Sequence, residues 1–144
     1  MYICYRKLSN KDCPDLINLW IRAKLPSKPN GRDSRQNLEK QMMLSRNSFL
    51  GAYQKEKLVG AVIASHNGRK GWINRLAVDP EVQNNGIASR LITLCEEFFH
   101  KEEIKIFACL IENWNVKSET LFLKKGYAKY KEVSYFTKRI DPEV

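Results

Sequence analysis

A polar loop between an apolar segment and an amphipathic one holds the residue types best suited to chemistry. The stretch runs through Leu76, Ala77, Val78, Asp79, Pro80, Glu81, Val82, Gln83, Asn84, Asn85, Gly86, Ile87, Ala88 and Ser89. Unpaired N–H groups at a helix start, together with the helix dipole, attract anions, and Gly86 lets a phosphate approach because it has no Cβ. The pattern indicates a pyrophosphate-binding cradle, although an ordinary connection between a strand and a helix can have the same composition.

The elements around this loop predict an α/β fold with a mixed sheet. Asn67-Gly68 is a favoured hairpin pair, and the apolar positions 87, 91, 94, 95 and 98 form one helical face. Strands are expected at 3–8, 48–53, 58–65, 71–78, 105–111, 127–131 and 134–139, and helices at about 12–25, 34–45, 87–100 and 116–125. The segment 105–111 is apolar enough to be a strand buried on both faces.

Length and charge limit the organisation and the partners. With 144 residues, 43% hydrophobic and 28% charged, the chain is expected to form one domain over 1–144. Its formal charge of +9, from 25 Lys plus Arg against 16 Asp plus Glu, favours an anionic partner. The basic residues are scattered rather than clustered, which favours a polyphosphorylated cofactor over nucleic acid.

The sequence contains no signal for a membrane or a metal. No apolar run approaches the roughly 20 residues of a membrane span, and residues 1–10 have no apolar core for secretion, so we expect a cytoplasmic protein. Cys4, Cys13, Cys95 and Cys109 lie far apart without metal-ligand spacing. We expect free thiols and no bound metal.

Two linked motifs between residues 71 and 127 carry a resemblance to a known family. Gln83, Gly86 and Ala88 match the cofactor loop of the GNAT superfamily of N-acetyltransferases, which the chain resembles here. The second motif of that family corresponds to Asn115, Ser118, Leu121, Phe122, Lys124, Gly126 and Tyr127. The N-terminal half agrees with the family only in the order of its elements.

The resemblance implies a fold, a cofactor and a reaction. The implied fold is a mostly antiparallel sheet flanked by about four helices, with 71–78 and 105–111 as a splayed parallel pair. The implied acyl donor is acetyl-CoA, held by residues 76–78, 83–89, Asn115 and Phe122, with the pantetheine arm between the splayed strands. The backbone N–H of Val78 would polarise the thioester, as oxyanion-type donors do. Asn115 would bind pantetheine or a water, and it also suits a helix N-cap.

The implied reaction is direct attack by a primary amine in a ternary complex, but two positions depart from the family pattern. Phe122 stands where many members have a tyrosine acid, and Trp72 stands where some have a glutamate base. Glu112 is our preferred base or water-positioning group, and Tyr135 could replace the missing phenol. Asn74, His66 and Tyr127 are weaker candidates, and His66 suits a turn better than catalysis. Because of these departures, a degenerate acyl-CoA-binding sensor stays an alternative.

The acceptor amine is not specified by any motif. In this fold it is selected by the first two helices, the loop 25–34 and the final hairpin, so a small molecule and a protein amine both stay open. An exposed edge strand could pair two copies of the chain, which leaves a homodimer open as well.

Overall fold

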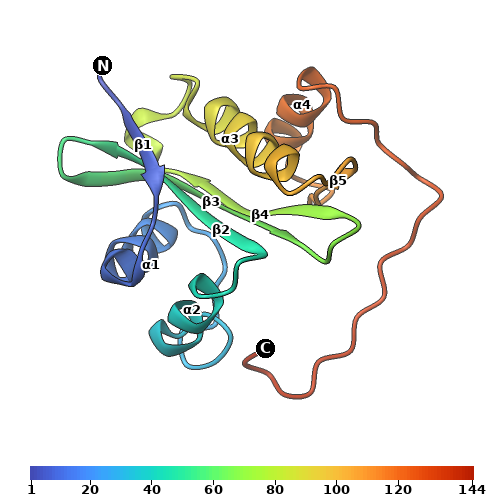
Figure 1. Cartoon of the computed structure of the whole chain (residues 1–144), viewed down its shortest axis with the longest axis horizontal. Helices are drawn as coiled ribbons and strands as arrows, with labels where there is room; N and C mark the ends of the chain where they lie inside the picture. The colour runs from blue at the N-terminus through green and yellow to red at the C-terminus, as the bar shows by residue number, and fades with distance from the viewer.

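A five-stranded sheet organises the computed structural model, which describes residues 1–144 (Figure 1). The strands lie in the order β1-β2-β3-β4-β5, and every pair is antiparallel except β4 and β5. In chain order the elements are β1 (Cys4–Lys7), α1 (Cys13–Arg22), α2 (Arg35–Met42), β2 (Asn47–Gln54), β3 (Lys57–His66), β4 (Gly71–Val78), α3 (Ile87–Lys101), β5 (Phe107–Ala108) and α4 (Val116–Lys124). Short 3-10 turns at Asn10–Asp12 and Pro80–Val82 precede α1 and α3. The predicted fold class is confirmed.

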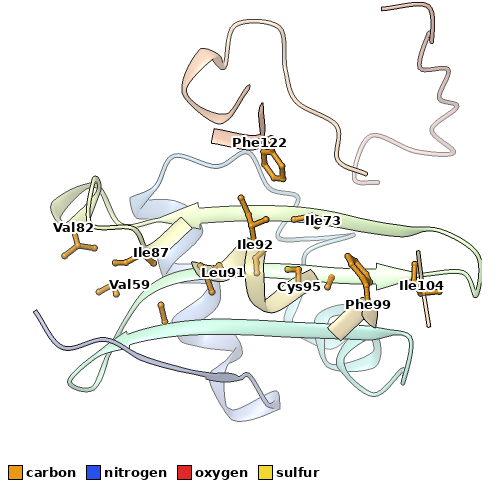
Figure 2. Packing of buried hydrophobic residues seen from close by; sticks show 13 residues of the cluster. Val59, Ile73, Val82, Ile87, Leu91, Ile92, Cys95, Phe99, Ile104 and Phe122 are labelled. Atoms are coloured by element: carbon orange, nitrogen blue, oxygen red, sulfur yellow. The ribbon is translucent and has the colours of Figure 1, made fainter. Parts of the chain in front are cut away.

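The hydrophobic core is divided in two by the sheet. On one face, α1 and α2 bury Leu16, Leu19, Trp20 and Leu38 against the strands. On the other face, α3 lays a continuous apolar stripe along the sheet, as Figure 2 shows for Ile87, Leu91, Ile92, Cys95 and Phe99. Alternating side chains of β3 and β4 supply both cores, because successive residues of a strand point to opposite faces.

Side-chain caps begin α2 and α4, whereas α1 and α3 begin without one. Ser34 accepts a hydrogen bond from the Asn37 N–H at 3.2 Å and so caps α2. The Asn67-Gly68 pair lies in the connection 67–70 between β3 and β4, but only Gly68 has a positive φ, of 88°, so the expected two-residue hairpin turn does not form. None of the helices combines the length and the apolar composition that a membrane span requires.

The C-terminal third departs from the expected strands. The segment 105–111 forms only the two-residue strand β5, and Lys105, Ile106 and Leu110 are exposed, so the prediction of a strand buried on both faces was wrong. The predicted strands 127–131 and 134–139 were also wrong. Residues 128–144, which we call the C-terminal arm, leave α4 as an extended coil without a paired neighbour (Figure 1). A strand needs an adjacent edge, and local β propensity cannot supply one.

Candidate active site

The candidate site begins where β4 loses its second neighbour. β5 pairs with β4 only at Gly71–Phe107 and Trp72–Ala108, and the Gly71 N–H donates to the Ile106 carbonyl at 2.9 Å. From Ile73 to Val78 the edge of β4 that faces away from β3 has no strand beside it. The opening is the splayed pair that the resemblance implied.

A bulge sets which backbone groups face this opening. Arg75 and Leu76 together oppose Val62, because Asn74 pairs with Ile63 and Ala77 pairs with Ala61. The Asp79 N–H donates to the Val59 carbonyl at 2.8 Å. Antiparallel residues alternate in direction, so the N–H of Val78, opposite Gly60, faces away from β3 and into the opening. Without the extra residue of the bulge, the Val78 N–H would face β3 instead of the opening.

Arg75 holds the bulge against the loop between α1 and α2. Its φ of 56° is unusual for a residue with a Cβ. The guanidinium lies 4.3 Å from the centre of the Trp20 ring and donates to the Pro26 carbonyl, and Asp33 lies 3.8 Å away. Burial lowers the pKa of Arg75. The contacts hold the loop 25–34, where acceptor selection is expected, beside the bulge of β4.

The loop that follows β4 presents free N–H groups to solvent. None of the backbone N–H groups from Gln83 to Ser89 donates a hydrogen bond within the protein. Gly86 is the N-cap of α3 with a φ of 76°, and a Cβ added there would meet nothing within 4 Å. The space beside Gly86 is therefore open, and the N-terminus of a helix of 15 residues points its unpaired donors into it. The arrangement suits a pyrophosphate group.

Asp79 anchors this loop from beneath, a role that the sequence did not reveal. Its carboxylate is buried, caps the 3-10 turn by accepting from the Glu81 N–H, and accepts from Arg22 Nε at 2.8 Å. Lys57 Nζ lies 3.5 Å away. Burial raises the pKa of Asp79, but these N–H and cationic partners outweigh it and lower the pKa overall. The only signal in the sequence was the Asp-Pro pair, which indicates a turn without naming the partners.

Gln83 connects the loop to both walls of the opening. Its side-chain amide donates to the Val78 carbonyl at 3.3 Å, and its Oε1 accepts from Lys117 Nζ of α4 at 2.9 Å. Gln83, Asn84 and Asn85 are exposed, whereas Ile87 is buried in the core. A cation of α4 therefore contacts the loop that carries the unpaired N–H groups at the start of α3.

Asn115 and Phe122 lie on the other wall. The Asn115 side chain accepts from the Ser118 N–H at 3.1 Å and caps α4, which is the structural role considered for it. Phe122 is buried, and its ring meets Tyr127 edge-on with the ring centres 5.0 Å apart. Figure 2 shows Phe122 reaching from α4 toward the core formed by α3. The Tyr127 hydroxyl donates to Glu96 at 2.7 Å, and burial raises its pKa, so this phenol already has a partner.

The two candidate catalytic side chains are both exposed to solvent. Glu112 is exposed in the turn after β5, and its side chain has no hydrogen-bond partner in the protein. Tyr135 lies on the C-terminal arm with 71% of its surface exposed. His66 accepts from the Gly68 N–H and faces Glu102 at 3.1 Å, so it has the turn role expected of it. The roles of Glu112 and Tyr135 stay predictions.

Comparison with known proteins identifies the family. The sequence profile described as "Acetyltransferase (GNAT) family" matches residues 13–127, which include β4, α3, β5 and α4. The chain therefore belongs to the GNAT family of acetyltransferases.

Individual relatives share the fold at low sequence identity. "Acetyltransferase plu1384" of Photorhabdus laumondii is 29% identical over 92 residues, which are 64% of this chain and 63% of that protein. The chain thus matches less than two thirds of that relative's length. The PaiA N-acetyltransferase of Thermoplasma acidophilum, solved with coenzyme A, gives a TM-score of 0.75 at 23% identity over 87% of this chain and 89% of that chain. The aminoglycoside N-acetyltransferase AAC(6')-Iy, solved with a CoA bisubstrate analogue, gives 0.82 at 17% identity over 96% and 99%.

Proposed function

We propose that this protein transfers the acetyl group of acetyl-CoA to a primary amine by direct attack in a ternary complex. The observation that carries the proposal is the open edge of β4, with the Val78 N–H facing into it, next to the unpaired N–H groups at the start of α3. A pyrophosphate and a thioester on one ligand would use both features together. The acetyltransferase relatives solved with coenzyme A or a CoA analogue support this choice of donor.

The cofactor would bind along the open edge. Its pyrophosphate would accept hydrogen bonds from the loop 83–89, where the space beside Gly86 admits it. The pantetheine amides would pair with β4 as an added strand, using backbone groups of Leu76 and Val78 that face away from β3. Lys117 would release Gln83 and approach the anion, since its charge lies on the same side.

The chemistry would depend mainly on position and on one backbone donor. As the amine attacks the thioester carbon, negative charge grows on the carbonyl oxygen, and the Val78 N–H would stabilise it. The tetrahedral species then expels the thiolate of CoA, and the new amide loses a proton from nitrogen. A thiol with a pKa of about 8.5 gives a thiolate that is a moderate leaving group and can depart without a phenolic acid. Glu112, or a water that it orients, is the proposed proton acceptor.

A binding module without catalysis is the second candidate. It is favoured by Phe122, which is buried in the position of a tyrosine acid, and by the exposure of Tyr135. An assay of free thiol released from acetyl-CoA across a panel of amines separates the two. Release that depends on an amine supports the enzyme, whereas acetyl-CoA binding without release for any amine supports the module.

A further inference from the structure

Arg75 combines a strained backbone with a largely buried cation. Its φ of 56° is the only positive φ in β4, and only 20% of its side-chain surface is exposed. Two guanidinium nitrogens, Nε and Nη2, are buried without a hydrogen-bond partner. Both features cost free energy, so they persist only where the surrounding structure holds them in place. Strain held in this way, three residues before a candidate reactive N–H, points to a functional role.

The partners that hold Arg75 belong to α1 and to the loop 25–34. The guanidinium lies over the ring of Trp20, near the end of α1, and donates to the Pro26 carbonyl at the start of the loop. Its ion-pair partner, Asp33, lies near the other end of the loop. None of these partners comes from the sheet. The side chain therefore ties the backbone of β4 to the loop rather than to the neighbouring strands.

Asp33 leaves this tie incomplete. Its carboxylate is buried, and Oδ2 accepts from the Lys28 N–H at 2.8 Å within the loop. The same oxygen lies 3.8 Å from Arg75 Nη2, which is close enough for an ion pair but beyond the N–H···O hydrogen-bond range of about 2.7 to 3.2 Å. A shift of the loop by roughly 1 Å would give this buried donor its missing partner. A ligand that presses on the loop would complete the tie.

The other end of the tie is the reactive backbone. The bulge that Arg75 and Leu76 form opposite Val62 turns the Val78 N–H into the opening. Beyond the bulge the regular ladder resumes at Ala77. A side chain that holds the bulge in place therefore also holds the direction of the proposed oxyanion donor.

We propose that Arg75 is a positioning residue through which the loop 25–34 keeps the Val78 N–H aimed into the opening. An amine acceptor bound against the loop would draw Asp33 onto the guanidinium and fix the bulge, so the donor is best aimed when both substrates are present. By linkage, the acceptor and acetyl-CoA would strengthen each other's binding. The catalytic consequence rests on the proposed function, whereas the tie between loop and bulge does not.

Amide hydrogen exchange on the unliganded protein tests the tie by itself. Arg75→Gly tolerates the positive φ but removes the side chain. Exchange at Ala77 and Asp79, whose N–H groups face β3 on either side of Val78, should accelerate at least about tenfold, whereas the amides of α3 should keep their protection. Lys55→Gly is the matched control, because Lys55 is an exposed cation with a φ of 55° in the turn between β2 and β3.

Three results of this experiment would overturn the proposal. Exchange at Ala77 and Asp79 could stay as in the wild type, or it could accelerate equally in Lys55→Gly. Acceleration that extends equally to α3 would mean a general loss of stability rather than a released bulge.

Asp33→Asn tests the loop end of the tie while keeping the size of the side chain. With an amine found active by thiol release, kcat should fall about 10- to 100-fold, as expected when a reacting group is misplaced. The Kd for acetyl-CoA, measured by calorimetry, should change less than about twofold. Millimolar ethylguanidinium should restore part of the turnover of Arg75→Gly but none of that of Asp33→Asn. A kcat like that of the wild type, or acetyl-CoA binding that weakens in step with kcat, would overturn the proposal.

Failure of the proposed function would look different. A wild type that binds no acetyl-CoA, or that releases no thiol with any amine, would remove the proposed function. The exchange pattern of Arg75→Gly would still decide whether Arg75 holds the bulge, because that measurement needs neither substrate.

Discussion

The two edges of β4 differ sharply although they belong to one strand. Toward β3 it is paired from Gly71 to Val78, and toward β5 it is paired only at its first two residues. The edge toward β3 is held by ladder hydrogen bonds, and side chains of β4 contribute to both hydrophobic cores. Along the open edge, the Val78 N–H has no neighbouring strand to pair with. The comparison shows that this sheet gains stability on one side of a strand and leaves binding groups free on the other.

The loop after β4 should respond most strongly to change. Gly86→Glu places a carboxylate among the N–H groups at the start of α3, and we expect acetyl-CoA affinity to fall at least about 100-fold because like charges repel there. A Cβ at Gly86 meets nothing within 4 Å, so the expected structural cost is the backbone strain of a side chain at a φ of 76°. Isothermal titration calorimetry measures the affinity, and circular dichroism checks the fold.

Gly126→Glu is the matched control for that variant. Gly126 also has a positive φ, of 94°, open space around its Cβ position and a place at a helix end, so the backbone strain and the added charge are comparable. Equal loss of affinity in both variants would mean that the effect is general and that the loop is not the anion site.

Val78→Pro should test the open edge of β4 without removing a hydrogen bond from the edge paired with β3. Val78→Pro removes the N–H that faces the opening and none that faces β3, so turnover should fall about 10²- to 10³-fold. Cofactor affinity should change much less. Val78→Ala keeps the N–H and is the control. Turnover close to wild type in a folded Val78→Pro would show that another donor stabilises the oxyanion.

The anchor beneath the loop should contribute stability. Asp79→Asn leaves Arg22 without its buried carboxylate and should cost about 1 to 3 kcal/mol of unfolding free energy. Because the pKa of Asp79 is lowered in the fold, its contribution is present above about pH 4 and is lost as the pH falls through the folded pKa. Urea unfolding between pH 3 and 7 should therefore show the two proteins converging in acid. A constant difference across this range would contradict the assignment.

The smallest effect is expected at Phe122. Phe122→Tyr restores a phenol at the family position, so turnover should rise or stay unchanged, measured as thiol release with any active amine. Because the ring is buried against Tyr127, thermal unfolding of the variant is the control for misfolding. A clear loss of turnover in a stable variant would indicate that the reaction requires an apolar wall here.

The sequence predicted the paired parts of the molecule better than the unpaired ones. The helix expected at 87–100 is α3, Ile87–Lys101, because its apolar spacing and the preceding Gly86 act locally. The opening beside β4 and the free N–H groups of the loop were also anticipated, through the matched motif. The bulge at Arg75 and the anchoring of Asp79 by Arg22 were missed, because each depends on a partner distant in sequence.

The C-terminal arm also shows that local sequence does not decide pairing. Residues 127–131 and 134–139 have strand propensity, yet they form no strand, because a strand exists only beside another edge. Glu112 and Tyr135 were proposed from element order alone, and both side chains are exposed. The proposed role of Glu112 depends on where the acceptor binds, and that of Tyr135 depends also on where the C-terminal arm lies.

Amide-resolved NMR of the protein with and without acetyl-CoA tests the central claim most directly. The Val78 N–H faces the open edge, whereas the Ala77 N–H faces β3, so the two neighbours carry their own control. The account predicts a large shift and slowed hydrogen exchange at the Val78 amide on binding, shifts across 83–89, and little change at Ala77. Saturating acetyl-CoA that leaves Val78 and the loop unchanged would contradict it.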